Sequence, residues 1–274
     1  MRERQREIIH TLGIKPEVDP LQEIERRTQF LADHLGHTGL RGFILGISGG
    51  QDSLLAGILA QRAVEHLRSN GHGATFYAAL LPYSAQIDRD DAELAIKTIN
   101  PDKVRDLDIQ PSVDAFATSF HDSEGSPLLD FDKGNVKARM RMIAQYAFAS
   151  THDLLVIGAD HAAEAATGFF TKHGDGGADI LPLAGLTKRQ GRAMLRVLHV
   201  PDVFITKQPT ADLLDTHPGQ ADENELGIRY DVLDDYLEGK EVSTKAAVAI
   251  ETRYDATAHK RALPVSYAIK KLVH

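Results

Sequence analysis

The residues best suited to chemistry form a glycine turn near the start of the chain, with the sequence Gly46-Ile47-Ser48-Gly49-Gly50-Gln51-Asp52-Ser53. Adjacent glycines let the backbone approach a ligand without a Cβ in the way. The N–H groups of the turn, and of a helix that begins there, can bind a phosphate because the helix dipole favours negative charge. Ser48 and Ser53 add hydroxyl donors, and Asp52 can hold a divalent cation. The turn suits a nucleotide phosphate, although a plain strand–helix connection capped by Asp52 would use the same residues.

A second acidic side chain, Glu164, follows another short apolar run at residues 154–158. Taken singly, Asp52 or Glu164 would be a helix cap or a surface acid. Beside a phosphate they suit Mg²⁺ together, since this ion takes one or two protein carboxylates and completes its shell with phosphate oxygens and water. We therefore expect a magnesium site made by Asp52 and Glu164.

Two lysines lie in or near glycine-rich loops. Lys172 is part of the sequence Thr-Lys-His-Gly-Asp-Gly-Gly-Ala-Asp at residues 171–179, and Lys188 lies a few residues further on. Such lysines can close over phosphates and stabilise charge that develops during displacement, although solvated surface charges would have the same pattern. His161 and His173 have no partner at metal-ligand spacing, so we interpret both as polar loop residues.

Apolar runs alternate with segments of helical periodicity, which predicts an α/β fold: a doubly wound parallel sheet with helices on both faces. The expected strands are residues 43–47, 74–81, 104–109 and 154–158. The expected helices are residues 1–12, 21–35, 54–67, 88–99, 111–120, 135–148, 187–198, 230–237 and 243–259. Ligands of such sheets bind beyond the carboxyl ends of the strands. The glycine turn and residues 160–164 are expected at that edge.

We expect one domain over residues 1–274, with residues 1–40 as a helical preface, because no repeat or linker interrupts the pattern. Residues 171–179 are expected to be a mobile loop and residues 206–225 a second long loop. The clearest helical segment, residues 135–148, has a single apolar stripe formed by Val136, Met140, Ile143 and Ala147.

Composition excludes several classes of protein. A chain of 274 residues with 42% hydrophobic and 26% charged residues is typical of a globular protein with a real core. No apolar run is long enough for a transmembrane helix, and the start lacks the apolar region of a secretory signal, so we expect a cytoplasmic protein. A net charge of −8 argues against a broad nucleic-acid surface. The absence of cysteine excludes disulfides, thiolate metal sites and a cysteine nucleophile.

The glycine turn lacks the lysine of a P-loop and the spacing of the dinucleotide-binding G-x-G-x-x-G pattern. Its Ser-Gly-Gly-x-Asp-Ser sequence resembles the signature of the ATP pyrophosphatases, which split ATP between the α and β phosphates. With further blocks in order from about residue 21 to the end, the chain resembles the ammonia-dependent NAD synthetase family. These blocks are residues 135–141, 158–164 and 170–179, Pro182-Leu183, Lys188, Pro209-Thr210-Ala211, Asp222-Glu223 and His259-Lys260-Arg261.

This resemblance implies an adenine nucleotide alpha hydrolase-like fold and a reaction, the last step of NAD biosynthesis. ATP would adenylylate the nicotinate carboxylate of nicotinic acid adenine dinucleotide and release pyrophosphate. Ammonia would then attack the acyl adenylate to give NAD and AMP. No protein nucleophile is required, which is consistent with the missing cysteine, and positioning and electrostatics would supply most of the catalysis. The resemblance also implies a homodimer with the substrate site at the subunit interface.

Site residues carried over from the family fall into four groups. ATP would be bound by Gly46, Ile47, Ser48, Gly49, Gly50, Gln51, Asp52, Ser53, Lys188 and Thr210. The dinucleotide substrate would be held by Arg139, Lys172, Asp179, His259 and Lys260. The catalytic group would be Asp52, Lys188 and Asp175, and the Mg²⁺ ligands Asp52 and Glu164. The loops around Lys172 and Thr210 are expected to order on binding. The family usually has Thr where this chain has Ala159, so that hydroxyl contact is missing.

Other functions use the same turn. One alternative is another carboxyl- or carbonyl-activating ATP pyrophosphatase, such as the synthetase subunit of a GMP synthetase-like amidotransferase. The His259-Lys260-Arg261 segment and the loop around Lys172 argue against it. A second alternative, a module that senses ATP without turnover, fits poorly with two intact metal-binding carboxylates. A glutamine-dependent synthetase is disfavoured because the chain has no amidase extension and no cysteine.

Overall fold

The computed structural model describes residues 1–84, 89–211, 215 and 220–267. A four-stranded parallel sheet lies at its centre, with the strand order β3-β2-β1-β4. Its strands are β1 (Gly42–Gly46), β2 (Thr75–Leu80), β3 (Lys103–Asp106) and β4 (Leu154–Val156). The direction of β4 continues in a parallel bridge between Ile157 and Ile180. The predicted parallel sheet and its strands are confirmed, although β3 ends earlier than expected.

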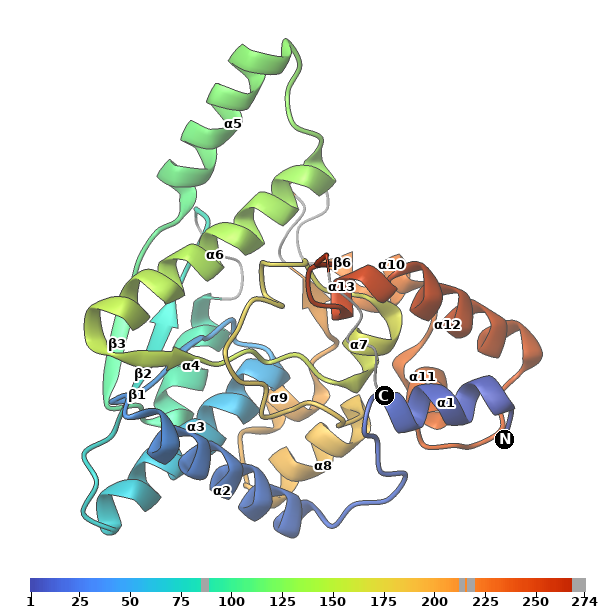
Figure 1. The fold of residues 1–274 in the computed structure, drawn as a ribbon, viewed down its shortest axis with the longest axis horizontal. Coiled ribbons are helices and arrows are strands. Elements are labelled where there is room, and N and C mark those ends of the chain that lie inside the picture. The colour runs from blue at the N-terminus through green and yellow to red at the C-terminus, as the bar shows by residue number, and fades with distance from the viewer. Residues whose placement is uncertain (85–88, 212–214, 216–219, 268–274) are drawn as a thin grey trace.

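Helices cover both faces of the sheet, as predicted (Figure 1). One face packs on α2 (Pro20–Thr38), α3 (Gln51–Ser69), α4 (Arg89–Ile99), α8 (Lys188–Val197) and α9 (Asp202–Thr206). The other packs on α5 (Gln110–Glu124) and α6 (Asp130–His152). Strand β1 shows the alternation: Phe43 and Leu45 enter the first core, and Ile44 enters the second.

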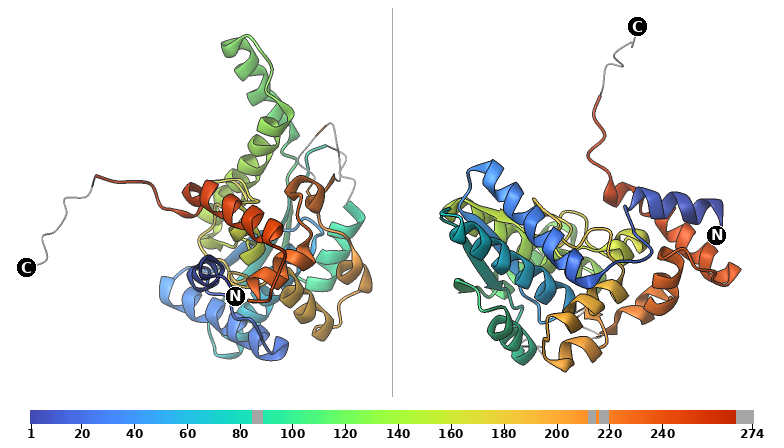
Figure 2. Two further views of the ribbon diagram at one scale, coloured as in Figure 1. Left: turned by 90° about the vertical axis from the view of Figure 1, so that its right-hand side faces the viewer. Right: turned by 90° about the horizontal axis from the view of Figure 1, so that it is seen from below.

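A third core lies beside the sheet (Figure 1) and joins helices from both ends of the chain. It contains α1 (Glu3–Thr11), α7 (Ala162–Thr167), α10 (Asp222–Leu226), α11 (Tyr230–Leu237) and α12 (Thr244–Ala256), with α13 (Ala258–Arg261) following. The two helices of the expected preface therefore separate, because α1 packs on the C-terminal helices whereas α2 packs on the sheet. Figure 2 shows α1 against the C-terminal helices from two further sides.

The predicted apolar stripe of α6 is confirmed for Val136 and Met140, which are partly buried against the second core, and is wrong for its other two members. Ile143 is 54% exposed and Ala147 is also exposed. The buried positions of this helix are Gly134, Lys137, Ala138, Ala144 and Ala149. Small residues let α6 lie close to the sheet, whereas Ile143 points outward. The start of α6 and the C-terminal part of α5 project from the body as an arm (Figure 1), while Val113 near the start of α5 is buried in the core.

The predicted loops have different outcomes. Residues 171–179 form turns and no helix or strand, as predicted, and their motion stays a prediction. The interpretation of residues 206–225 as plain loop is wrong for the part described. This part contains β5 (Thr210–Ala211) and β6 (Gln220–Ala221), which pair antiparallel, and α10. Residue 88, the expected start of α4, lies outside the described residues. Within the described part of the chain, no helix has the length and apolar character to span a bilayer.

Candidate active site

A cavity of about 520 Å³ opens at the carboxyl ends of β1 and β4, where ligands of such sheets bind. The ten residues expected to bind ATP all line it: Gly46, Ile47, Ser48, Gly49, Gly50, Gln51, Asp52, Ser53, Lys188 and Thr210. The other two members of the expected catalytic and metal sets, Asp175 and Glu164, line it as well. Segments far apart in sequence therefore meet at one edge of the sheet.

The glycine turn is held in a conformation that requires glycine. Gly49 has a φ of +83°, and a Cβ there would lie 2.7 Å from the backbone nitrogen of Ala92. The hydroxyls of the turn are used within it: Ser48 N–H donates to Ser53 Oγ (3.2 Å), and Gly50 N–H donates to Ser48 Oγ (3.2 Å). Both serines therefore fix the turn, beyond the ligand-donor role expected of them.

Lys188 and Asp52 form a close ion pair across the cavity, with Nζ 2.6 Å from Oδ2. The lysine side chain is only 5% exposed. Burial is the largest influence and alone would raise the pKa of Asp52, but the charge and hydrogen bond of Lys188 and the other favourable contacts of the carboxylate together outweigh it, so this pKa lies below its ordinary value. Burial likewise opposes the charge on Lys188, and Asp52 and Glu164 reverse the effect and raise its pKa. Both groups are therefore charged at neutral pH.

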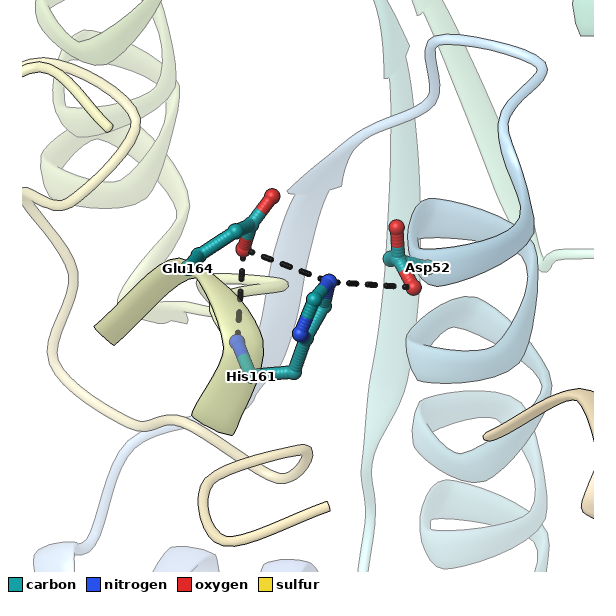
Figure 3. Close-up of side chains that lie close together, drawn as sticks. All are labelled: Asp52, His161 and Glu164. Carbon is teal, nitrogen blue, oxygen red and sulfur yellow. Dashed lines mark hydrogen bonds and ion pairs between the residues drawn. The ribbon is translucent and has the colours of Figure 1, made fainter. Parts of the chain in front are cut away.

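His161 lies between the two expected metal ligands (Figure 3). Its Nε2 is 3.7 Å from Asp52 Oδ1 and 3.7 Å from Glu164 Oε2, and this nitrogen has no hydrogen-bond partner among the residues that the structure describes. The interpretation of His161 as a polar loop residue is wrong, because the side chain is buried and caps α7. Sequence spacing missed it because the partner Asp52 comes from another strand end. His173 is exposed, in keeping with its prediction.

The residues present fit Mg²⁺. Ligand atoms of Asp52, His161 and Glu164 lie within 4.8 Å of one another. His161 Nδ1 accepts a hydrogen bond from Ala163 N–H (3.3 Å), so a neutral ring has its proton on Nε2 and cannot use that atom as a ligand. Burial lowers the pKa of His161 to about 4, which keeps the ring neutral. Two carboxylates then remain for the metal, the hard oxygen ligands that Mg²⁺ takes beside phosphate.

Carboxylates crowd this cavity, and this raises the pKa values of some of them. Burial, with the nearby charges of Asp175 and Asp52, raises the pKa of Asp160 to about 8. Burial and the charges of Asp160 and Asp52 raise the pKa of Glu164 well above its ordinary value. A site that holds several acids at such cost is suited to a bound cation. Asp160 was not among the predicted residues, although its place after β4 was a usable signal.

The residues expected to bind the dinucleotide do not all line the cavity, unlike the residues expected to bind ATP. Arg139 donates to the carbonyl of Lys172 (3.3 Å), and Lys172 Nζ donates to the carbonyl of His259 (2.7 Å). Lys260 lines the cavity and donates to the carbonyls of Gly168 and Phe170, each at 2.8 Å. Arg139, Lys172 and His259 thus form a chain of contacts outside the cavity lining.

Asp179 lies elsewhere. Its carboxylate accepts hydrogen bonds from the Val156 N–H (2.8 Å) and from the Tyr146 hydroxyl (2.9 Å). Asp179 is not among the described residues that line the cavity. Ala159 lines the cavity, so the missing hydroxyl falls beside the nucleotide residues.

A parallel sheet with a glycine turn at its carboxyl edge defines a nucleotide-binding α/β protein. The model of the NAD synthase family matches residues 23–264, and the chain belongs to this family. The resemblance found in the sequence is thereby confirmed. The NH(3)-dependent NAD(+) synthetase of Bacillus subtilis strain 168 is 58% identical over 262 residues, 96% of each chain. The enzyme of the same name from Bacillus licheniformis is 59% identical over the same length.

Solved structures agree with the fold. The NAD⁺ synthetase from Burkholderia pseudomallei matches with a TM-score of 0.82 and 48% identity, covering 95% of this chain and 97% of that one. The NMN synthetase from Francisella tularensis matches with a TM-score of 0.81 and 35% identity, covering 91% and 99%. The predicted doubly wound α/β fold is therefore confirmed.

Proposed function

We propose that this chain is a single-domain ammonia-dependent NAD synthetase, a ligase that uses ATP to amidate nicotinic acid adenine dinucleotide. The observation that carries this is the assembly of the glycine turn, Asp52, Glu164 and Lys188 around one cavity. The chain is also 58% identical, over 96% of its length, to an NH(3)-dependent NAD(+) synthetase.

The reaction has two steps whose bonds balance. An oxygen of the nicotinate carboxylate attacks the α phosphorus of ATP, and the bond to the bridging oxygen breaks to release pyrophosphate. Ammonia then attacks the acyl carbon, loses a proton, and AMP leaves with the former carboxylate oxygen. Lys188 is placed to neutralise charge on the phosphates as the first bond breaks. The glycine turn orients the nucleotide so that the α phosphorus faces the carboxylate.

Mg²⁺, when bound, would neutralise phosphate charge and polarise the phosphorus–oxygen bonds. Asp52 and Glu164 would hold it, because they supply hard oxygen ligands on one side of the cavity. His161 would donate its Nε2–H to one of these carboxylates and so keep both in place, as groups around metal ligands commonly do. The raised pKa of Glu164 fits a carboxylate that needs a cation to stay ionised at low cost.

The dinucleotide would be bound by Arg139, Lys172, Asp179, His259 and Lys260. The chain of contacts that joins Arg139, Lys172 and His259 supports this for three of them. The Asp179 carboxylate already accepts a hydrogen bond from the Val156 backbone N–H. We therefore propose that Asp179 contributes to dinucleotide binding by positioning the backbone of the site.

A homodimer completes the proposal. Large apolar side chains are exposed along α5, α6 and the residue before α6: Phe116 (48%), Leu129 (71%) and Phe131 (62%) on the arm, and Ile143 (54%) further along α6. Such a surface is suited to a partner of the same kind. Phe131 also lines the cavity, so a second copy on this arm would border the substrate site.

One observation favours a second substrate. The NMN synthetase from Francisella tularensis has the same fold with 35% identity, so the mononucleotide is a natural competitor for the dinucleotide. The amide-forming alternative related to GMP synthetase would instead take xanthosine monophosphate.

The test is pyrophosphate release by the purified chain with ATP, Mg²⁺, ammonium and nicotinic acid adenine dinucleotide, each omitted in turn. Release that needs all four and yields NAD supports the proposal. A preference for nicotinic acid mononucleotide in the same assay would identify the chain as an NMN synthetase. A preference for xanthosine monophosphate would identify it as a GMP synthetase-like enzyme. No release with any acceptor would contradict the proposed function.

A further inference from the structure

The first turn of α8, where Lys188 begins, is held by another helix. Asp234 of α11 is 3% exposed and accepts hydrogen bonds from both Lys188 N–H (3.1 Å) and Arg189 N–H (2.8 Å). The capping box pairs the other two, since Thr187 Oγ1 accepts from Gln190 N–H (3.2 Å) and Gln190 Oε1 accepts from Thr187 N–H (3.1 Å). All four N–H groups that a helix start leaves open are therefore paired within the protein.

The same helix also contacts the other end of the lysine. The Lys188 ammonium lies 5.2 Å from the centre of the Tyr230 ring, within the range of a cation–π interaction. Tyr230 in turn donates its hydroxyl to Asp222 Oδ2 (3.1 Å). Helix α11 therefore fixes the backbone of Lys188 through Asp234 and borders its ammonium through Tyr230, while Asp52 of α3 receives the ammonium at 2.6 Å.

These contacts join two cores. Helix α11 belongs to the core of α1, α7 and α12, with Leu233 and Leu237 fully buried in it. Helix α8 belongs to the sheet core through Met194 and Leu195. The distance from Lys188 to the glycine turn is therefore set by how the two cores are joined, and Asp234 is a direct polar contact between them.

Asp234 is more than a helix cap. Thr187 and Gln190 already form a capping box at this end of α8, which is the ordinary local device. A carboxylate buried from a distant helix costs desolvation and is not needed for the helix to begin. The Asp234 carboxylate additionally fixes the backbone position of Lys188, whose side chain must reach Asp52 across the cavity.

We propose that Asp234 is a positioning residue that acts through Lys188: it holds the backbone of this lysine so that the ammonium lies at the phosphates of bound ATP. The inference rests on the proposed function for the role of Lys188. Its removal should reduce the rate of the first chemical step and the affinity for ATP, and it should leave the KM for the dinucleotide nearly unchanged.

The test is a double-mutant cycle of Asp234→Ala and Lys188→Met, measured as ATP affinity by calorimetry and as kcat for pyrophosphate release. We expect Asp234→Ala to lower kcat about 10- to 100-fold, as loss of an outer supporting group does. Lys188→Met is expected to lower it about 10²- to 10³-fold. The double variant should equal Lys188→Met within about twofold, because Asp234 has nothing left to position.

Asp235→Ala is the matched control. Asp235 is the next residue of α11 and binds the guanidinium of Arg189 (2.9 Å) but not the backbone of α8. We expect it to stay within about twofold of wild type, as for a surface ion pair. If Asp234→Ala does not fold, Asp234→Asn serves instead, since it keeps the volume and one acceptor oxygen, and the same cycle is run with it.

The proposal would be overturned if the fold-losses of Asp234→Ala and Lys188→Met multiplied in the double variant, both for ATP affinity and for kcat. Asp234 would then be a general structural group. Rates that fall equally for Asp235→Ala would overturn it too. A wild-type chain that binds ATP but makes no NAD would contradict the proposed function, and the cycle in ATP affinity would then decide the role of Asp234 by itself.

Discussion

The nucleotide half of the candidate site comes mainly from one short segment, whereas the half expected to bind the dinucleotide draws on separate segments. The turn at residues 46–53 places its groups by backbone geometry, with Gly49 in a conformation that admits no other residue comfortably. Arg139, Lys172 and His259 instead come from α6, a turn-rich segment and α13, and they are linked through backbone carbonyls.

This difference in construction predicts a difference in sensitivity. A group fixed by its own turn, buried and paired, has no substitute when it is removed. A charged group on an exposed chain of contacts contributes little on its own, because water and neighbouring charges take its place. We therefore expect larger losses of activity from changes in the buried, turn-fixed half than from changes in the exposed half.

The largest effect is expected at the Asp52–Lys188 pair. Asp52→Ala removes a metal ligand and the partner of a buried lysine, so pyrophosphate release should fall about 10³-fold. Steady-state release with saturating ATP measures it, and circular dichroism confirms that the variant is folded. A variant that keeps more than a tenth of the wild-type rate would show that the nucleotide half is not fixed as described.

The next effect is expected at His161. His161→Leu removes the Nε2–H that lies between Asp52 and Glu164, so Mn²⁺ binding in the presence of ATP should weaken about 10- to 100-fold. Electron paramagnetic resonance of free Mn²⁺ gives the affinity without any turnover. His173→Leu, at an exposed histidine, is the control and should leave it unchanged. Equal affinities in wild type and His161→Leu would refute the role given to this ring.

A smaller effect is expected in the exposed half. Arg139→Ala should raise the KM for nicotinic acid adenine dinucleotide about fivefold with kcat within about twofold, because an exposed charge contact is worth about 1 kcal/mol. Arg62→Ala, at an exposed arginine of α3, is the matched control. A hundredfold loss in kcat for Arg139→Ala would erase the contrast between the two halves.

The smallest effect concerns Asp160 and pH. Its pKa in the folded chain is about 8, above the ordinary value, so the folded state binds the extra proton and wild-type stability falls as pH rises from about 4 through 8. Asp160→Asn removes this loss. Its melting temperature should therefore exceed that of wild type by at least about 2 °C more at pH 8 than at pH 5.

Added Mg²⁺ and ATP should narrow that gap, because a bound cation stabilises the ionised carboxylates. Asp122→Asn, at an exposed residue of α5, should show the same difference from wild type at both pH values. A pH-independent effect of Asp160→Asn would mean that the carboxylates of the cavity are not crowded in solution.

The sequence predicted the features that local backbone geometry determines, and it did not predict those that depend on tertiary packing. The turn at residues 46–53 was predictable because glycine, serine and aspartate act there through local backbone geometry. Glu164 was predictable because strand ends meet at one edge of a parallel sheet. The second half of the apolar stripe of α6 was not, since helical periodicity cannot tell which stripe faces the sheet when Ile143 points outward and Ala144 inward.

The roles of His161 and Asp234 were missed for one physical reason: each acts through a partner distant in sequence, whereas the position of Asp160 after β4 was a local signal. His161 meets Asp52 of α3, and Asp234 meets the first turn of α8, across the boundary between two cores. No local pattern records such contacts. The short strands within residues 206–225 were missed because two residues each are too few to produce a period.

In the proposed reaction, this edge of the sheet activates a carboxylate by joining it to AMP. The direct measurement uses nicotinic acid adenine dinucleotide labelled with ¹⁸O in the nicotinate carboxylate, with ATP, Mg²⁺ and ammonium, followed by mass spectrometry of the products. An acyl-adenylate mechanism predicts one ¹⁸O in AMP and none in pyrophosphate. Label in pyrophosphate or in inorganic phosphate, or unlabelled AMP formed alongside NAD, would contradict it.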